Sequence, residues 1–251
     1  MSDNPEIRFA RLERAPAYKN VSEAILKDII DGRLTVGKRL PSEHKLAEQF
    51  GVHRSTVREG IRLLEETGVL RREFGKRLVV SRPSYGSVGN QISRAMILHE
   101  VTFRELWETI MAIEPAAAAL AARRRTPEDI DRIADNIART RVALNDNKVI
   151  VALDIEFHSL VAQACANRAI VLAREALTQL FYPAFEAVLT GVEVAGTRLL
   201  AAHEAIAQAI ADSDVETTRK WMERHINDFR KGYEMSGFDI DRSVEAPARE
   251  K

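Results

Sequence analysis

Residues 38–76 read KRLPSEHKLAEQFGVHRSTVREGIRLLEETGVLRREFGK. The segment predicts a short helix over 42–50, capped at its start by Ser42, and a second helix over about 53–67 after a tight turn at Gly51. Apolar residues at i, i+4 and i+7 give the second helix one face that can be buried. These residues are Val57, Ile61 and Leu64.

The neighbouring sequence completes a recognisable order of elements. Apolar residues recur at helical spacing from 17 to 31, and Gly32 ends that helix. Two β-prone runs, 69–72 and 78–81, follow the quoted helices and are joined by a turn. Helix, helix, turn, helix and hairpin is the order of a winged helix-turn-helix, whose third helix fits the DNA major groove while the hairpin contacts the adjacent backbone.

Side chains on this region suit two kinds of DNA contact. Arg54, Ser55 and Arg58 lie near the outward N-terminal side of the third helix, where arginine can bind guanine bidentately. Other basic residues suit phosphates, contacts that position the protein without reading sequence. Those residues are Lys38, Arg39, Lys45, Lys76 and Arg77.

Charge and composition support this division of the chain. The 251 residues have a net charge of zero, but residues 1–82 carry 17 basic and 12 acidic residues, whereas 83–251 carry 20 and 25. A basic first third joined to an acidic remainder suggests a polyanion-binding head. The single cysteine, Cys165, excludes an internal disulfide framework. With no signal peptide or membrane span visible, we expect a cytoplasmic protein.

The rest of the chain predicts a mainly α protein with an all-helical, antiparallel C-terminal bundle. A Gly/Pro/Ser cluster begins at 83, and beyond it long Ala/Leu/Arg/Glu-rich segments show helical periodicity without strand alternation. Thr102 and Thr126 each open a capping box. The predicted domains are a flexible N-terminus at 1–16, a DNA-binding domain at 17–82, a linker at 83–93, a helical effector and metal domain at 94–235, and a flexible tail at 236–251.

Four residues in the helical part form a candidate metal site. Asp154 and His158 are four residues apart and project from one face of a helix. His203 and His225 lie in later helical segments. One oxygen and three imidazoles suit a divalent ion such as Zn²⁺, Ni²⁺ or Mn²⁺, provided that the three segments meet in space.

Residues 18–82 resemble the DNA-binding head of GntR-type bacterial transcription regulators. The resemblance rests on Leu40-Pro41-Ser42-Glu43, Leu46-Ala47, Gly51-Val52, Arg54 with Thr56-Val57-Arg58-Glu59, and Leu63-Leu64 before Gly68. It implies that position 44, Arg54 and Arg58 face bases and that Gly75 lies at the wing tip. The predicted DNA-contacting residues are therefore Arg39, His44, Lys45, His53, Arg54, Ser55, Thr56, Arg58, Gly75, Lys76 and Arg77.

This sequence departs from the GntR pattern at three positions. His44 stands where the family usually has Arg, which implies an altered or pH-dependent base preference. His53 replaces the usual Ser or Thr, which predicts a poorer N-cap for the recognition helix. Arg77 replaces the second glycine of the wing turn.

Residues 90–235 resemble the FCD ligand-sensing domain of the FadR subgroup of GntR regulators. The matching runs are EPAAAALAARR at 114–124, DIEFHSLVAQACAN at 154–167 and HEAIAQAIADSDVETTRKWMERHIND at 203–228. The resemblance implies a metal on Asp154, His158, His203 and His225 that helps to hold a small carboxylate effector. The family's effector-binding arginine is replaced by Ile110, so either the metal alone or another arginine holds the acid group, or the effector is less acidic than is usual in the family. Candidate effector contacts are Arg104, Trp107 and Arg168.

We therefore expect a homodimeric transcription regulator rather than an enzyme. It would act as a repressor, bind a palindromic operator in double-stranded DNA and respond to a small organic acid, with no membrane partner. One alternative is a regulator for which the metal itself is the signal. Another is a metal-dependent hydrolase or lyase, in which an open metal position activates water. The sequence marks out no general base for that reaction, because Glu156 and Glu204 adjoin ligands but point to other helical faces.

Overall fold

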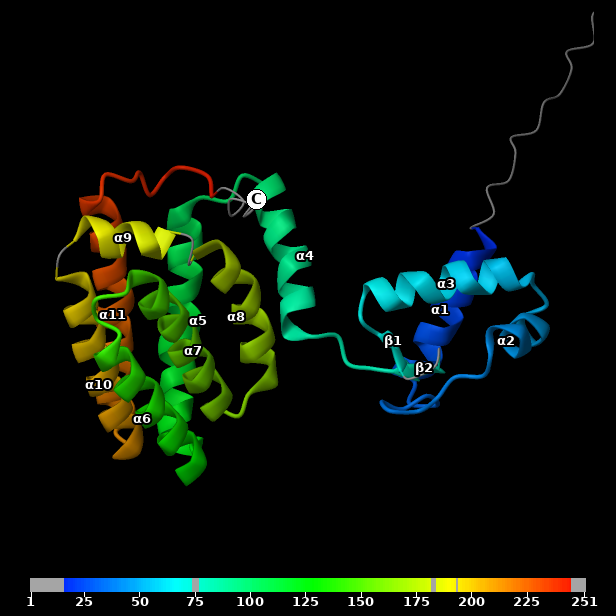
Figure 1. The fold of residues 1–251 in the computed structure, drawn as a ribbon, viewed down its shortest axis with the longest axis horizontal. Coiled ribbons are helices and arrows are strands. Elements are labelled where there is room, and N and C mark those ends of the chain that lie inside the picture. Colours follow the sequence, from blue (N-terminus) through cyan, green and yellow to red (C-terminus); the bar gives the residue numbers. More distant parts are fainter. Residues whose placement is uncertain (1–15, 74–76, 182–183, 193, 245–251) are drawn as a thin grey trace, which may run out of the picture. The chain divides into compact units, whose positions relative to one another are not determined.

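The computed structural model describes residues 16–73, 77–181, 184–192 and 194–244. The chain divides into two compact units, an N-terminal unit at 1–84 and a C-terminal unit at 85–251. Eleven helices and two strands lie in the described ranges (Figure 1). In these ranges no helix is long and apolar enough to cross a membrane.

The N-terminal unit has the predicted winged order. Its strands pair in antiparallel register, with Leu70 opposite Val80 and Glu73 opposite Arg77. The segment before α2 joins the same ribbon, because the N–H of Gly37 donates to the carbonyl of Val80. The elements are α1 (Ala17–Ile30), α2 (Glu43–Phe50), α3 (Arg54–Glu66), β1 (Leu70–Glu73) and β2 (Arg77–Val80).

The predicted inner face of α3 is confirmed. Val57, Ile61 and Leu64 are buried in a core that also contains Val21 and Ile25 of α1. The two helices approach closely because α3 carries a glycine at the crossing. A Cβ on Gly60 would lie 2.7 Å from the carbonyl oxygen of Tyr18.

Both helices of the helix-turn-helix are capped by side chains. The Ser42 hydroxyl accepts a hydrogen bond from the backbone N–H of Lys45, as predicted. Gly51 ends α2 in the left-handed region at φ 64°. At α3 the cap is made by an imidazole: His53 Nδ1 accepts a hydrogen bond from the N–H of Ser55 at 3.3 Å, and its weakness relative to a hydroxyl cap stays a prediction. A ring nitrogen here takes the part of the usual hydroxyl.

The C-terminal unit is entirely helical in its described part. Both predicted capping boxes are present, with Thr102 paired to Glu105 and Thr126 paired to Asp129. The helices are α4 (Tyr85–Leu98), α5 (Phe103–Arg124), α6 (Pro127–Val142), α7 (Asn147–Ala164), α8 (Arg168–Phe181), α9 (Phe185–Gly191), α10 (Ala195–Ala211) and α11 (Val215–Met235).

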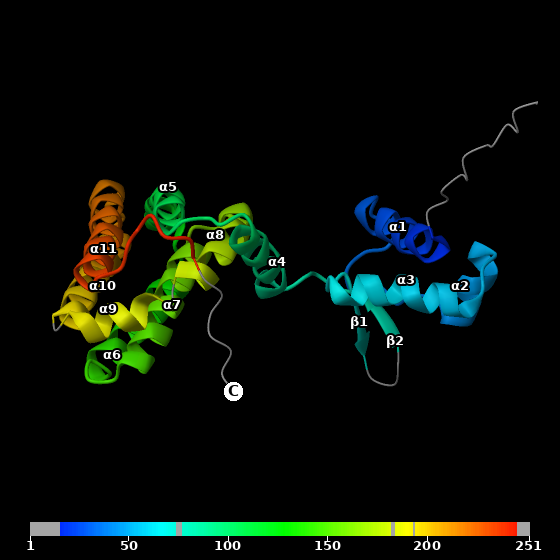
Figure 2. The ribbon, with the colours of Figure 1, turned by 90° about the horizontal axis from the view of Figure 1, so that it is seen from above.

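The structure differs from the predicted linker at 83–93. Residues from Tyr85 onward form α4, which lies beside α8 in both Figure 1 and Figure 2. The buried Ser93 hydroxyl donates to the carbonyl of Ala176. A Cβ on Gly89 would lie 3.1 Å from the carbonyl of Glu175, so small residues let the helices pack closely.

The predicted flexible ends have different outcomes. Residues 236–244 pack against the start of α5: Ile240 is buried, and the N–H of Phe103 donates to the carbonyl of Arg242. This part of the predicted tail at 236–251 is therefore folded. Residues 245–251, and 1–15 of the predicted flexible N-terminus at 1–16, lie outside the described ranges.

Replacing Gly60 by Ala tests the α1–α3 contact. The added methyl group has to displace the Tyr18 carbonyl, and overpacking of this kind costs about 1–3 kcal/mol. We expect faster amide hydrogen exchange throughout α1 and α3 in the full-length protein. The matched control is Gly86→Ala in α4, where a Cβ meets nothing within 4 Å. Unchanged exchange in α1 and α3 of Gly60→Ala would contradict the close approach.

Candidate nucleic-acid interface and metal centre

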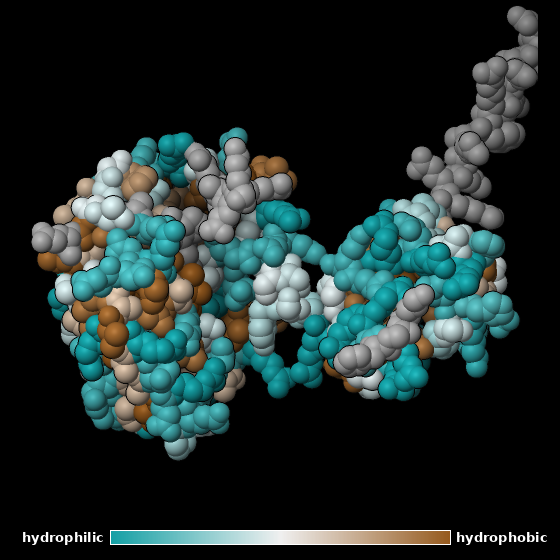
Figure 3. Space-filling model, in the orientation of Figure 1, coloured by the Kyte–Doolittle hydropathy of each residue, from teal (hydrophilic) through white to brown (hydrophobic). Residues whose placement is uncertain are grey.

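An arginine-rich groove lies where α2, α3 and the two strands meet. The beginnings of α2 and α3 supply one wall, and the strands supply the other. Figure 3 shows hydrophilic residues over most of the visible face of this unit. The charged and imidazole side chains that line the groove are Arg39, Glu43, His44, Arg54, Arg72 and Arg77.

Glu43 binds three arginines that lie in or beside this groove. Its carboxylate accepts hydrogen bonds from Arg54 at 3.2 Å, from Arg58 at 3.2 Å and from Arg72 at 3.4 Å. Burial favours the neutral acid, but the bonds from Arg58 and Arg54 outweigh it and lower the pKa of Glu43. Only 12% of this side chain is exposed, whereas 58% of Arg54 and 59% of Arg58 are. The acid therefore holds the guanidinium groups while leaving them accessible.

The other predicted DNA-contacting residues lie mainly on the surface. His44 is exposed and pairs with Glu48, one turn further along α2. His53 and Ser55 are joined at the start of α3 by a 2.7 Å hydrogen bond. Arg39, Lys45 and Arg77 are exposed, whereas Thr56 is half-buried. Gly75 and Lys76 lie outside the described residues.

The four predicted metal ligands come together inside the C-terminal unit. α7 supplies Asp154 and His158, α10 supplies His203, and α11 supplies His225. One ligand atom from each residue lies within 4.8 Å of all the others. Asp154 Oδ1 is 3.2 Å from His203 Nε2, and His225 Nε2 is 3.1 Å from His158 Nε2 and 3.3 Å from His203 Nε2. We call these four residues the Asp/His cluster.

The donor set and its spacing fit a divalent transition ion. Ligand atoms about 2.0–2.2 Å from one ion lie roughly 3 Å apart when they are adjacent in its coordination shell, which the shortest separations match. Asp154 Oδ1 is buried without a hydrogen-bond partner. Leaving a carboxylate oxygen in this state is costly unless a cation satisfies it. Three imidazoles and one carboxylate are borderline donors suited to Zn²⁺, Ni²⁺ or Mn²⁺.

The pKa values of two of the three histidines are shifted in the direction that suits a metal, whereas Glu114 and Asp154 raise the pKa of His158 against the effect of burial. Burial, together with the nearby His203 and His158, holds the pKa of His225 well below its usual value. Burial likewise lowers the pKa of His203, although Asp154 opposes it. A neutral imidazole presents a lone pair to a metal. The His203 ring stacks on Phe157 at a centroid distance of 3.7 Å, which fixes its orientation.

A buried acid that the sequence analysis did not single out stands behind the cluster. Glu114 of α5 lies 3.2 Å from His158 Nδ1 and accepts a 2.8 Å hydrogen bond from Arg174 Nε of α8. Burial alone would raise the pKa of Glu114, but Arg174 and His158 lower it to about 2. A His158 Nδ1–H bond to this carboxylate leaves the Nε2 lone pair facing the cluster.

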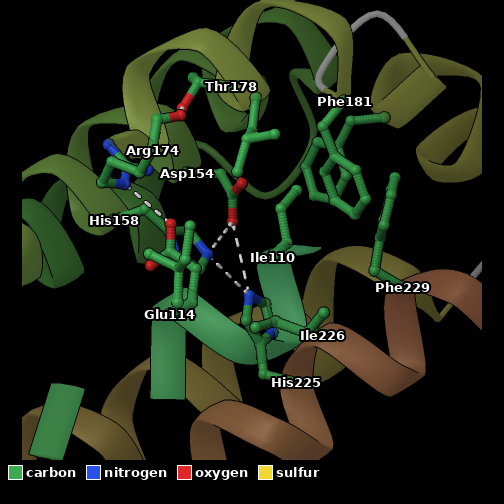
Figure 4. Close-up of a pocket in the computed structure, with 13 residues that line it drawn as sticks. Ile110, Glu114, Asp154, His158, Arg174, Thr178, Phe181, His225, Ile226 and Phe229 are labelled. Carbon is green, nitrogen blue, oxygen red and sulfur yellow. Dashed lines mark hydrogen bonds and ion pairs between the residues drawn. The ribbon is translucent and has the colours of Figure 1, made fainter. Parts of the chain in front are cut away.

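A cavity opens beside the cluster. Figure 4 shows Glu114, Asp154, His158, Arg174 and His225 at one end and Phe181 and Phe229 at the other. His203 belongs to the cluster but does not line this space. The lining residues of this first cavity are Ile110, Ile113, Glu114, Asp154, His158, Arg174, Leu177, Thr178, Phe181, Phe185, His225, Ile226 and Phe229.

The predicted effector contacts do not line the first cavity. Arg104 pairs with Asp241 at the surface, and Arg168 is exposed. Trp107 is half-buried and lies under the guanidinium of Arg230 at 4.9 Å. Ile110, at the position of the family's arginine, does line the cavity, but the arginine that reaches it is Arg174. Sequence spacing gave no signal for Arg174.

The acids flanking the metal ligands point away from the cluster, as predicted. Glu156 pairs with Arg139 at 2.6 Å, and Glu204 pairs with Arg141 at 2.6 Å, on the surface of the unit. Neither is placed to act as a base on a molecule in the cavity. The acid that does reach the cavity, Glu114, is held by Arg174 and His158.

Replacing Glu114 by Gln tests the buried ion network. Breaking one partner of such a network costs about 3–5 kcal/mol, so we expect a loss of this size at pH 7. In the unfolded wild-type chain the Glu114 carboxyl becomes protonated as pH falls below about 4.5. In the folded protein its pKa is about 2, so it stays ionised until the pH is lower still. The stability difference between wild type and variant therefore shrinks as pH falls through this window. Denaturant unfolding at several pH values measures it.

The control for this experiment is Glu156→Gln, which breaks a surface ion pair. Such pairs contribute about 0–1 kcal/mol, so the control should remain close to wild type. A Glu114→Gln protein that matches the control at pH 7 would contradict the role given to the buried acid.

Comparison with known proteins matches both units. Residues 17–80 match the model for bacterial regulatory proteins of the gntR family, and residues 105–228 match the FCD domain. The Glc operon transcriptional activator of Escherichia coli K12 is 31% identical over 175 residues, which cover 68% of this chain and 69% of that protein. A putative HTH-type transcriptional regulator, RmpR of Mycobacterium gastri, is 32% identical over 225 residues, which cover 86% of this chain and 78% of that protein.

Two further relatives agree with this assignment. The HTH-type transcriptional repressor NanR of Cronobacter sakazakii is 28% identical over 225 residues, with 86% of each chain covered. The solved structure of Streptococcus agalactiae GntR shares the fold with a TM-score of 0.62 at 24% identity, over 85% of this chain and 99% of that chain. These relatives are named as regulators, not as enzymes. The chain therefore belongs to the GntR family of bacterial transcription regulators, with a winged helix-turn-helix followed by a helical FCD domain.

Proposed function

We propose that the protein is a homodimeric repressor of the FadR subgroup that binds a palindromic operator in the cytoplasm. A two-fold dimer presents two equivalent recognition helices, and a palindrome supplies two equivalent half-sites. The observation that carries the DNA-binding part is the arginine groove organised by Glu43. The NanR relative is named as a transcriptional repressor and aligns over most of both chains, which supports repression as the mode of action.

The geometry favours base contacts for some of these side chains and phosphate contacts for others. Arg54 and Arg58 are on the first two turns of α3 and are held from below by Glu43, so they are ordered before DNA arrives. Ordered arginines lose less rotamer freedom when they bind base edges. Arg39 and Arg77, which line the groove, and the exposed Lys45 of α2 suit phosphate contacts that set the register of the protein on the duplex.

Arg58→Ala tests the recognition-helix assignment. A bidentate arginine–guanine contact contributes about 1–3 kcal/mol, so we expect about tenfold weaker operator binding and relaxed preference at one base pair. Titration of fluorescent operator at fixed salt measures the affinity, and a set of single-base operator variants measures the preference. The control is Arg33→Ala, which removes an equally exposed arginine that pairs with Asp28 outside the groove. Equal affinities for the two variants would refute the assignment.

We also propose that Asp154, His158, His203 and His225 hold a divalent metal beside which a small carboxylate effector binds. The convergence of these four ligand atoms next to the first cavity carries this part. The ion would supply a positive charge that attracts the carboxylate, and Arg174 adds a second charge on the cavity wall. The effector regulates only if it binds the DNA-competent and DNA-incompetent arrangements of the dimer with different affinity.

Burial of the cluster supports a resident ion over a metal signal. His203 is fully buried, Asp154 is 2% exposed, and none of the four ligands is exposed. An ion enclosed by helices on several sides exchanges only when those helices separate, which suits a permanent component of the site. A sensor ion must exchange as its concentration changes in the cell.

Asp154→Asn tests the metal site with little change in shape. The amide keeps the volume but loses the charge, so we expect the bound metal to fall well below one ion per chain after dialysis. Elemental analysis of the purified full-length protein measures the content. His99→Ala, which removes an exposed histidine of the same unit, is the control and should retain its metal. Full occupancy in Asp154→Asn would rule out this ligand set.

A further inference from the structure

A second cavity adjoins the first one behind a partition of two aromatic rings. The two cavities share three lining residues, Phe185, His225 and Phe229. The ring centroids of Phe185 and Phe229 are 5.1 Å apart. The residues of the second cavity lie on α9, α10, α11 and the α9–α10 connection: Phe185, Val188, Val192, Val194, Ala195, Arg198, Leu199, Ala202, His225, Asp228, Phe229, Lys231, Gly232 and Met235.

The sizes of the two spaces are unequal. The first cavity has a volume of about 30 Å³ and the second about 150 Å³. The first alone accommodates only a few water molecules beside the Asp/His cluster. A larger ligand at the cluster needs additional room, and the nearest is on the other side of Phe185 and Phe229.

The walls determine which ligand would be stable there. Apart from Thr178, whose hydroxyl donates to the backbone carbonyl of Arg174, the polar side chains of the first cavity lie at one end: Glu114, Asp154, His158, Arg174 and His225 (Figure 4). Beyond them, apolar side chains line the way through the partition and most of the second cavity. The exceptions in the second cavity are His225 of the Asp/His cluster, the Arg198–Asp228 ion pair, at 2.7 Å, and the exposed Lys231. Hydroxyl groups placed along this path would lose their water without gaining partners.

We infer that the two cavities form one ligand site for a monocarboxylic acid with an apolar tail. Its carboxylate lies at the polar end, near Arg174 and the Asp/His cluster, and its tail passes Phe185 and Phe229 into the second cavity. This inference rests on the proposed function, because it identifies the class of the effector at that metal. It also assigns to Arg174, on α8, the anion-binding charge that Ile110 cannot supply from α5.

The charge of the polar end agrees with a single carboxylate. Glu114 and Asp154 contribute two negative charges, and Arg174 contributes one positive charge. With a divalent ion held by neutral histidines, one net positive charge remains. One carboxylate neutralises it, whereas a second carboxylate on the path beside Phe185 and Phe229, before Arg198 and Lys231 are reached, would lie among apolar side chains without a partner.

The test measures binding of straight-chain acids to the metal-loaded, full-length protein by isothermal titration calorimetry. The probes are acetate, butyrate, hexanoate and octanoate, with gluconate as a polyhydroxylated acid and 1-hexanol as a tail without an acid. Burying one methylene group increases affinity about four-fold, so affinity should rise from acetate to hexanoate. Gluconate and 1-hexanol should bind at least tenfold more weakly than hexanoate.

Ala195→Leu tests the second cavity directly. Ala195 lines that cavity at the start of α10, remote from the metal ligands along the helix. The larger side chain should abolish the gain from butyrate to hexanoate while leaving acetate binding and metal content unchanged. The control is Ala207→Leu, which enlarges another half-buried alanine of α10, in a groove facing α6. It should retain the wild-type dependence on chain length.

The outcomes separate this inference from the proposed function. Binding of acetate or gluconate with no increase along the series would overturn the apolar tail and leave the carboxylate effector standing. A wild-type chain-length dependence that survives in Ala195→Leu would overturn the second cavity as its cause. No binding of any acid to the metal-loaded protein would overturn the proposed effector and this inference together.

Discussion

The buried carboxylate of Glu114 is the charge on which the arrangement of the C-terminal unit depends. It belongs to α5, faces His158 on α7 and accepts a hydrogen bond from Arg174 on α8, so three helices meet at one acid. A buried charge is tolerated only where opposite charges and hydrogen-bond donors surround it. The same group therefore fixes which histidine nitrogen faces the cluster and where the cavity's guanidinium lies. Core packing alone would determine neither.

The N-terminal unit uses an acid in a comparable way. Glu43 holds arginines from α3 and β1, and its lowered pKa keeps it ionised as their partner. The difference lies in exposure, because the arginines around Glu43 remain open to solvent whereas Arg174 is buried. One acid thus holds solvent-exposed cations in the DNA-binding unit, and the other holds a buried cation beside the first cavity.

Local rules predicted the elements and much of the cluster. The i, i+4 spacing places Asp154 and His158 on one helical face whatever the tertiary structure. His203 and His225 were candidates as histidines of later helical segments, and the resemblance to FCD domains supported the complete set. Arg174 was missed because it is 60 positions from Glu114, and an arginine in a helical segment usually lies at the surface. Only the packing of α8 against α5 reveals the pair.

The segment after residue 83 and the cap at His53 also have local explanations. Ser, Gly and Pro after residue 83 suggested a linker, yet Gly89 and Ser93 are the small residues that a close helix crossing requires. His53 was expected to cap poorly because capping preferences favour hydroxyl and carboxyl oxygens. The ring nitrogen reaches the same backbone N–H once the chain turns at that residue.

The tight contact between α4 and α8 has a mechanical consequence. α8 carries Arg174, Leu177, Thr178 and Phe181 on the wall of the first cavity, and α4 is the helix that directly follows the N-terminal unit. Ser93 is hydrogen-bonded to the α8 backbone, and the absence of a side chain at Gly89 lets the two helices pack in direct contact. A molecule that shifted α8 on entering the cavity would therefore also shift α4, the helix through which the chain continues from the DNA-binding unit.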